Sequence, residues 1–324
     1  MRSGRRTHDR SSNRRLLVVV SVSGGKDSTE TAFRAIDQVG VKRCKFVFAD
    51  TGNEHELTYE YVGHYLPTVL GANVDVVRAE FSRQIAAKRV YCETVWPEKG
   101  VPEKIVQRAL RVLHPTGNPF LDLCLWKGRF PSRMAQFCTQ HLKRIPLDRY
   151  LLDRIAEGFS VESWRGIRRD ESLHRRNAPD RERVAEGYCI VHPIADLTSM
   201  EVVAAVRARG VELNPLYKLG MRRVGCMPCI NCCKDELLEI WKRFPEYLAI
   251  KREWESLVCL ASKRGWSTFF TDAARDGETE AELFDRLCID GRVRWAQTAR
   301  GGRQIDAFRL QAPPACSSVY GLCE

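Results

Sequence analysis

The chain has 324 residues, of which 44% are hydrophobic and 29% charged, a balance typical of a globular protein with an ample core. It contains no run of about 18 apolar residues, so we expect no membrane span. The formal net charge of +11 favours nucleotides or nucleic acid as binding partners. The alternative interpretation is a basic protein that binds no such ligand.

The chain begins with a basic segment. Residues 1–15 are polar and rich in arginine, and they lack the apolar stretch of a secretory signal. We therefore predict a disordered basic tail over residues 1–15 and a cytoplasmic protein.

The most informative segment follows this tail. Leu16–Val20 is apolar and mostly β-branched, which predicts a buried strand, and the residues from Ser28 onward predict an amphipathic helix. Glycines between a strand and a helix let successive backbone N–H groups point at one ligand, and the helix dipole adds partial positive charge. We therefore expect an anion-binding loop, made of Ser23, Gly24, Gly25, Lys26, Asp27 and Ser28. Its spacing is neither that of a Walker loop nor that of a dinucleotide fingerprint, so both are excluded.

A second strand is predicted over Val41–Ala49. Asp50 and Thr51 follow it directly, at the strand end where open α/β sheets bind ligands. Another interpretation of this segment is a helix cap, which Asn53 can supply.

The rest of the first two thirds alternates between predicted strands and helices. The strands are Val74–Val77, Phe159–Trp164 and Tyr188–Val191, and a helix is predicted over Met200–Gly210. This alternation predicts an α/β fold, a parallel twisted sheet with helices on both faces. A segment rich in proline, glycine and tryptophan, at about 91–133, interrupts the alternation and is predicted to be a lid or an insertion.

The chain changes character after residue 235. Asp235–Leu260 carries apolar residues at helical spacing, so we expect a mainly helical C-terminal region over residues 236–324. Within it, Arg292–Leu310 is predicted to form a hairpin.

The chain has 13 cysteines, and four of them cluster at Cys226, Cys229, Cys232 and Cys233. Clustered cysteines in a cytoplasmic chain indicate metal or redox chemistry. Thiolates three residues apart can converge on a [4Fe–4S] cluster; structural zinc and inert buried thiols are the alternatives. The spacing favours Cys232 over Cys233 as a ligand. The role of Cys316 and Cys323 remains open. Each could be a nucleophile, a sulfur carrier, a further metal ligand or a thiol without a role.

Five sequence blocks together resemble one protein family. The hexapeptide Ser23–Ser28 resembles the pyrophosphate loop (PP-loop) of the ATP pyrophosphatases, whose fold is that of the adenine nucleotide α-hydrolases. The other four blocks resemble segments of proteins like phosphoadenosine phosphosulfate (PAPS) reductase, and they are Phe137–Pro146, Gly166–Ser172, His192–Thr198 and Asn214–Cys229. The blocks keep the family order, so we predict a PP-loop, PAPS reductase-like domain over residues 16–235.

This resemblance implies roles for individual residues. The loop would hold the pyrophosphate part of ATP with Mg²⁺ as counter-ion, and the implied catalytic residues are Lys26, Asp27 and Arg168. Further nucleotide contacts are implied at Asp50, Thr51, Gly166 and Lys143. The implied ligands of a [4Fe–4S] cluster are Cys138, Cys226, Cys229 and Cys232.

Three departures separate the chain from the reductases. Its loop is complete, whereas reductases that act on adenylyl sulfate usually carry a degraded loop. Thr139 follows Cys138 where those reductases have a second cysteine, and the tail Cys316–Glu324 lacks the motif that supplies their nucleophile. We therefore predict cleavage of ATP to AMP and pyrophosphate, with sulfur transfer from a donor protein to DNA or tRNA. The alternatives are a thiol-dependent reductase of adenylyl sulfate or PAPS, and a non-catalytic nucleotide-binding subunit.

Overall fold

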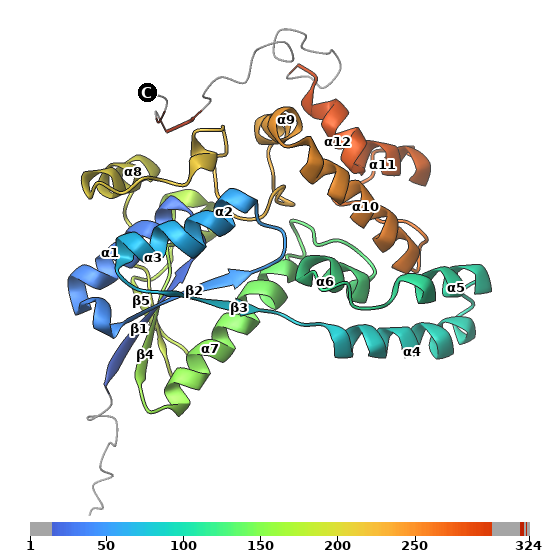
Figure 1. The fold of residues 1–324 in the computed structure, drawn as a ribbon. Helices are drawn as coiled ribbons and strands as arrows, with labels where there is room; N and C mark the ends of the chain where they lie inside the picture. The colour runs from blue at the N-terminus through green and yellow to red at the C-terminus, as the bar shows by residue number, and fades with distance from the viewer. Residues whose placement is uncertain (1–14, 300–317, 321, 323–324) are drawn as a thin grey trace, which may run out of the picture.

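The computed structural model describes residues 15–299, 318–320 and 322, which form a central sheet flanked by helices and, beside it, a second group of helices (Figure 1). The sheet has six strands in the order β3-β2-β1-β4-β6-β5, and β5 is its antiparallel edge strand. The strands are β1 (Leu16–Val22), β2 (Cys44–Asp50), β3 (Val74–Arg78), β4 (Ser160–Trp164), β5 (Arg181–Arg183) and β6 (Cys189–Val191). The predicted α/β fold with a mostly parallel sheet is confirmed.

Strand β1 lies at the centre of the sheet and is buried on both faces. Its Val20 is in register with Phe46 of β2 and with Trp164 of β4. Val18 and Val20 pack into one core with α1 (Lys26–Val39), while Leu17 and Val19 pack into another with α7 (Ile145–Ala156). Burial on both faces explains why the strand is continuously apolar rather than alternating.

Helix α1 begins at Lys26, two residues earlier than expected, because Gly25 already serves as its N-cap. After β2 the chain continues through α2 (Glu56–Glu60), the π-helical turn η3 (Tyr61–Tyr65) and α3 (Leu66–Leu70). Later in the chain, α8 (Ser199–Ala208) packs against α1. The short helical turns are η2 (Val41–Arg43), η4 (Thr139–Arg144), η5 (Arg169–Glu171), η6 (Leu173–Arg175) and η7 (Pro215–Tyr217).

The second group of helices unites two distant parts of the sequence. Three helices cover the predicted insertion, which starts inside the first of them, and they are α4 (Ser82–Glu98), α5 (Glu103–Val112) and α6 (Pro119–Lys127). The others are α9 (Lys234–Arg243), α10 (Pro245–Ala261), α11 (Glu280–Leu287) and α12 (Ile289–Ala296). All of these helices except α11 contribute to one core, in which Phe120 of α6 stacks on Trp254 of α10 with ring centroids 5.6 Å apart.

The expected helical C-terminal region is present in the described residues, but two details were wrong. The single helix expected over Asp235–Leu260 is divided into α9 and α10, because Pro245 cannot donate the backbone hydrogen bond that continues a helix. The start of the predicted hairpin, from Arg292, is helical within α12, and residues 300–310 lie outside the described part. None of the described helices is long and apolar enough to cross a membrane.

Candidate nucleotide site

The glycine loop connects β1 to α1 at the carboxyl edge of the sheet. Gly24 has a positive φ of 75°, a conformation that favours glycine, and this turns the chain sharply after β1. The Ser28 hydroxyl fixes the turn, since it accepts from the Ser23 N–H at 3.1 Å and donates to the Gly25 carbonyl at 2.9 Å. Three of the predicted loop residues thus hold one another in place.

The loop presents backbone donors. Among the described residues, no acceptor meets the N–H groups of Gly24, Gly25, Asp27 and Ser28. These groups lie at the N-terminus of α1, where the helix dipole favours negative charge. Such a set of free donors is what an anion-binding loop requires.

Lys26 is buried at the start of α1, with 3% of its surface exposed. Its ammonium donates to Asp27 Oδ2 at 2.7 Å and lies 5.4 Å from the ring centroid of Tyr320. Its backbone N–H donates to the Tyr217 hydroxyl at 3.0 Å, and burial raises the pKa of that tyrosine. The lysine charge is therefore held beside the free donors of the loop.

The loop after β4 meets the glycine loop. A Cβ atom at Gly166 would lie 2.8 Å from the carbonyl carbon of Asp27, so only glycine allows this approach. Two residues further on, Arg168 Nε donates to Asp27 Oδ1 at 2.6 Å, and its Nη1 group donates to Asp170. Burial lowers the pKa of Arg168, but the two carboxylates outweigh it and raise the pKa overall. Asp27 thus holds Lys26 on one side and Arg168 on the other.

A polar pocket of about 200 Å³ opens over the loop. Five of the predicted loop residues and Gly166 line it, and they are Ser23, Gly25, Lys26, Asp27, Ser28 and Gly166. Residues that the prediction did not include also line it, namely Ser21, Glu171, Arg175, Tyr217, Arg222, Arg223 and Val224. Several belong to the motif blocks Gly166–Ser172 and Asn214–Cys229, so the blocks themselves were the signal that could have identified them.

Asp50 and Thr51 lie at the carboxyl end of β2 but do not line this pocket. Asp50 accepts from the Tyr59 hydroxyl at 2.8 Å and pairs with Arg78 at 3.4 Å. Thr51 Oγ1 donates to Glu54 at 2.7 Å and lies 3.5 Å from the sulfur of Cys226. The structure therefore brings Thr51 to the cysteine turn rather than to the glycine loop.

The cysteine turn, defined as Cys226–Cys229, is attached to the end of β2. Cys226 forms an isolated antiparallel bridge with Glu54, and Met227 N–H donates to the Asn53 carbonyl at 2.6 Å. The Asn53 amide donates to the Pro228 carbonyl at 3.2 Å, so Asn53 holds the turn instead of capping a helix. His55 caps α2 in its place.

Cys138 and Lys143 belong to the same neighbourhood. Burial raises the pKa of Cys138, and the nearby Cys229 adds to the effect. Burial lowers the pKa of Lys143, but Cys226, Glu54 and Cys229 together raise it overall. Lys143 is therefore close to the cysteine turn and is absent from the pocket of the glycine loop, where the resemblance had placed it.

The predicted metal ligands come only partly together. Cys229 lies close enough to Cys138, Cys226 and Cys232 to raise the pKa of each, and the thiol chemistry suits iron or zinc. The thiol of Cys232, however, is buried and directed at the carbonyl of Cys233 and at Glu236. In the described part of the chain no three His, Cys, Asp or Glu side chains are arranged as a metal site, so the four-thiolate cluster stays a prediction. Cys316 and Cys323 lie outside the described residues.

Arg223 links the two halves of the site. It lines the pocket over the glycine loop, and only Val224 and Gly225 separate it from the cysteine turn. Burial lowers the pKa of Arg223, but Cys229, Glu171 and Cys226 outweigh it and raise the pKa. The side chain is thus a permanent positive charge between the pocket and the cysteines.

A family model described as "Phosphoadenosine phosphosulfate reductase domain" matches residues 17–232. This chain belongs to that family. The resemblance drawn from the five sequence blocks is therefore confirmed, and PAPS reductase family membership indicates an adenine nucleotide as ligand.

Individual relatives of this PAPS reductase family member differ in coverage. An uncharacterized 37.8 kDa protein of Escherichia phage 186 is 42% identical over 94% of this chain and 96% of its own length. An adenosine 5'-phosphosulfate reductase of Allochromatium vinosum is 36% identical, but only over 31% of this chain and 36% of its own length. A crystal structure of phosphoadenylyl-sulfate (PAPS) reductase from Candida auris, 15% identical, covers 65% of this chain and 82% of that one with a TM-score of 0.39.

Proposed function

We propose that the chain cleaves ATP to AMP and pyrophosphate at the glycine loop and uses the AMP group to prepare a nucleic acid for sulfur transfer. The observation that carries the proposal is the complete loop, with four free N–H groups and a buried lysine at one helix terminus. A loop of this kind is suited to hold the pyrophosphate that leaves when the α phosphate is attacked.

The reaction has two displacements. An oxygen of the acceptor attacks the α phosphorus of ATP, the bond from that phosphorus to the bridging oxygen breaks, and pyrophosphate leaves with the electron pair. A sulfur nucleophile from a donor protein then attacks the activated acceptor atom, and AMP leaves with the original oxygen. No net oxidation or reduction occurs in either displacement.

The residues of the loop have separate tasks in this proposal. The N–H groups of Gly24, Gly25, Asp27 and Ser28 bind the oxygens of the departing pyrophosphate, and Lys26 neutralises the charge that develops there. Asp27 positions both cations, since it accepts from Lys26 at 2.7 Å and from Arg168 at 2.6 Å. Mg²⁺ is the expected counter-ion, bound through the phosphates and water.

The proposal also includes the cysteines, although they take no part in the two displacements. A [4Fe–4S] cluster on Cys138, Cys226, Cys229 and Cys232 stays a prediction, supported by the type of ligand and by the meeting of Cys138 with the cysteine turn. Because the thiols are not arranged for four-fold ligation, no step of the reaction is routed through a cluster.

A second candidate is a thiol-dependent reductase of adenylyl sulfate or PAPS. It is favoured by the relative from Allochromatium vinosum, whose name states that activity and which matches about a third of each chain. The complete loop favours the first candidate, because a reductase substrate already carries an activated sulfate and needs no departing pyrophosphate.

The deciding experiment is product analysis under anaerobic conditions with ATP, adenylyl sulfate and PAPS offered separately, with and without oligonucleotides and a thiol donor. We expect AMP and pyrophosphate from ATP, and no sulfite from the two sulfates. Sulfite release without ATP cleavage would establish the reductase, and nucleotide binding without any product would establish a non-catalytic subunit.

A Gly25→Val variant tests whether ATP binding depends on the glycine loop. A Cβ atom at Gly25 would lie 3.3 Å from the Tyr217 hydroxyl and 3.4 Å from the Ser23 hydroxyl, so valine has no room and covers the donors. We expect ATP binding, measured by calorimetry, to be abolished. Unchanged affinity in this variant would place the nucleotide elsewhere.

A further inference from the structure

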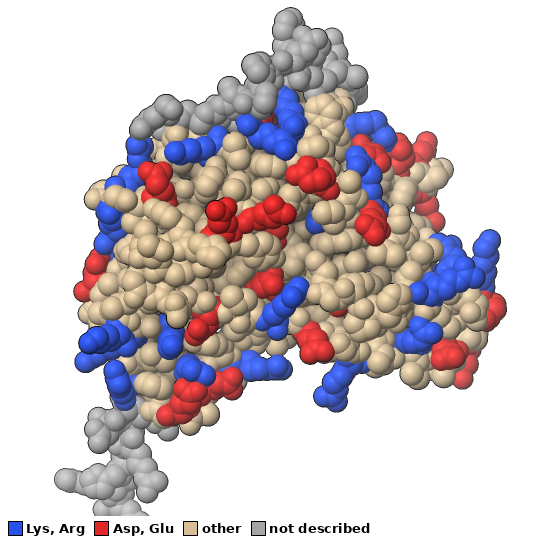
Figure 2. Space-filling view, in the orientation of Figure 1, with Lys and Arg blue, Asp and Glu red and all other residues tan. Residues whose placement is uncertain are grey.

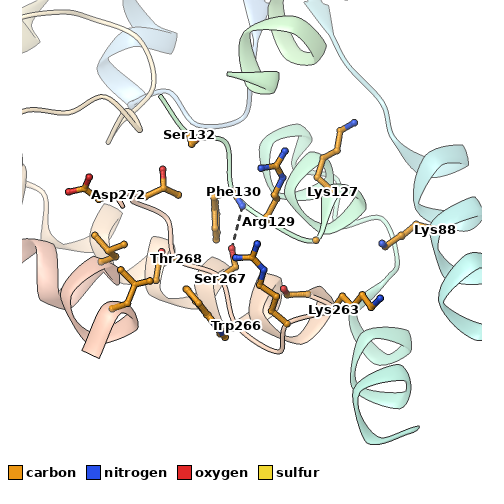
Figure 3. Close-up of a pocket in the computed structure, with 16 residues that line it drawn as sticks. Lys88, Lys127, Arg129, Phe130, Ser132, Lys263, Trp266, Ser267, Thr268 and Asp272 are labelled. Atoms are coloured by element: carbon orange, nitrogen blue, oxygen red, sulfur yellow. Dashed lines mark hydrogen bonds between the residues drawn. The ribbon is translucent and has the colours of Figure 1, made fainter. Parts of the chain in front are cut away.

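We propose that a basic pocket in the helical half of the molecule binds the phosphates of a single-stranded nucleic acid. The inference deepens the proposed function, on which it rests for the identity of the polymer. The pocket has a volume of about 400 Å³ and lies where the end of α6 and the loop after it meet the segment between α10 and α11 (Figure 3).

Five cationic side chains line this pocket. They come from three separate segments, and they are Lys88, Lys127, Arg129, Lys263 and Arg264. Lys127 and Arg129 project from one wall, and Lys263 approaches from the opposite one (Figure 3). The acidic side chain that lines the pocket, Asp272, is engaged by Arg286 at 3.6 Å.

None of these five cations has an ion-pair partner within 4.0 Å among the described residues. Elsewhere in the molecule arginines such as Arg168, Arg209 and Arg286 each pair with two or more carboxylates. Burial lowers the pKa of Lys127, and the neighbouring Arg129 lowers it further, which shows that like charges face one another here. A bound anion would relieve that repulsion.

The pocket also offers an aromatic surface. Trp266 lines it and is half-buried, while its indole N–H is fully buried and has no acceptor among the described residues. The exposed part of the ring offers a surface on which a base can stack.

The size and surroundings of the pocket favour a strand over a duplex. A volume of about 400 Å³ accommodates one nucleotide but not paired strands. Lys and Arg side chains also gather over α4 and α5, interspersed with acidic side chains (Figure 2). Cationic grooves with aromatic side chains are typical of single-strand binding.

This pocket and the glycine loop have no lining residue in common. The loop pocket is formed around β1, α1 and the turns after β4, whereas the basic pocket is formed by α4, α6 and the segments after α6 and α10. A nucleic acid held here would therefore leave the nucleotide site free.

The test compares two double variants of the full chain with equal changes of charge. Lys263→Glu with Arg264→Glu alters the pocket, and the matched control Lys42→Glu with Arg43→Glu alters an exposed adjacent pair that does not line it. Binding of a fluorescein-labelled oligothymidylate of about 20 nucleotides is followed by anisotropy at several salt concentrations. ATP binding by calorimetry serves as the separate measure of the glycine loop.

We expect the pocket variant to bind the strand at least about tenfold more weakly than the control, with a salt slope smaller by about 1.4, because each lost phosphate contact removes about 0.7 on a single strand. Trp266→Ala removes the ring and should weaken binding about fivefold through the lost stacking surface. ATP affinity should not change in any of these variants.

The inference is wrong if the pocket variant and the control bind the oligothymidylate with equal affinity. It is also wrong if a duplex of the same length binds as tightly as the single strand. Displacement of the strand by inorganic phosphate at an equal phosphate concentration would likewise overturn it in favour of a small-anion site. If the wild-type chain does not bind ATP, only the proposed function is refuted, because the measurement of strand binding does not depend on ATP.

Discussion

A Cβ atom at Gly166 would lie 2.8 Å from both the carbonyl carbon and the carbonyl oxygen of Asp27, and 3.0 Å from the Ser28 nitrogen. The loop after β4 therefore rests directly on the first turn of α1, backbone against backbone. This contact fixes the distance at which Arg168 reaches Asp27, and so it sets the position of both cations beside the pocket.

Gly166→Ala should therefore disturb the site and the fold together. The added methyl group meets backbone that cannot move aside, and overpacking of this kind costs about 1 to 3 kcal/mol in the free energy of unfolding. We expect a lower midpoint in urea and weaker ATP binding. Gly63→Ala is the matched control, since nothing lies within 4 Å of its Cβ position; it should leave ATP binding unchanged and, within the helical turn η3, should not lower the urea midpoint.

Arg168→Gln should lower the rate of ATP cleavage about a hundredfold while ATP still binds, because the guanidinium positions Asp27, which in turn holds Lys26. The control is Arg169→Gln at the next position, whose guanidinium pairs instead with Asp180 and Asp196. Both variants are assayed for kcat and KM with ATP. If the control variant loses activity as strongly as Arg168→Gln, the role assigned to Arg168 is wrong.

Glu255 should make stability depend on pH. It is buried on α10 and accepts from the backbone N–H groups of Phe269 at 2.6 Å and Ile289 at 3.0 Å. Burial nevertheless raises the pKa of Glu255 from 4.5 to about 7. Between these values the folded chain keeps a proton that the unfolded chain releases, so stability falls as pH rises through this window, by about 3 kcal/mol in total.

Urea unfolding between pH 4.5 and 7.5 measures this effect. Glu255→Gln carries no titratable group and should remove the Glu255 part of the slope. Glu253→Gln, at an exposed position of the same helix, should keep the wild-type slope. Identical slopes in all three proteins would contradict the assignment.

The cysteine prediction is tested by metal analysis of protein purified without oxygen. A [4Fe–4S] cluster requires about four irons per chain and a brown colour. Cys226→Ser and Cys229→Ser should lose the iron, whereas Cys44→Ser, on β2, should keep it. A colourless protein with one zinc would show that the turn is a zinc site. If Cys233→Ser loses the iron but Cys232→Ser keeps it, the fourth ligand is Cys233 rather than Cys232.

Local sequence was sufficient to predict the parts of the molecule that depend on neighbouring residues. The strand Leu16–Val22, the turn at Gly24 and the start of α1 form one continuous segment, in which each residue restricts the next. The approach of Gly166 to this loop is a long-range contact, and it was reached only through the family resemblance.

The parts that were missed depend on contacts between distant segments. Helix α5 has a clear apolar side, but this side packs against α4 and against α10, more than a hundred residues later, and its spacing alone does not indicate that distant partner. Lys143 follows Cys138 by five residues, and a π-helical turn between them directs the chain to the cysteines. Nothing in the spacing of either residue indicates such a turn.

The shared helical core has a consequence for how the chain can be divided. The family match ends at residue 232, yet Phe120 of the insertion stacks on Trp254 and packs against Phe269, both of which follow that limit. A chain cut after residue 235 would leave the apolar sides of α5 and α6 facing water and would be prone to aggregate. The described helices after residue 235 therefore belong to one folding unit with the insertion.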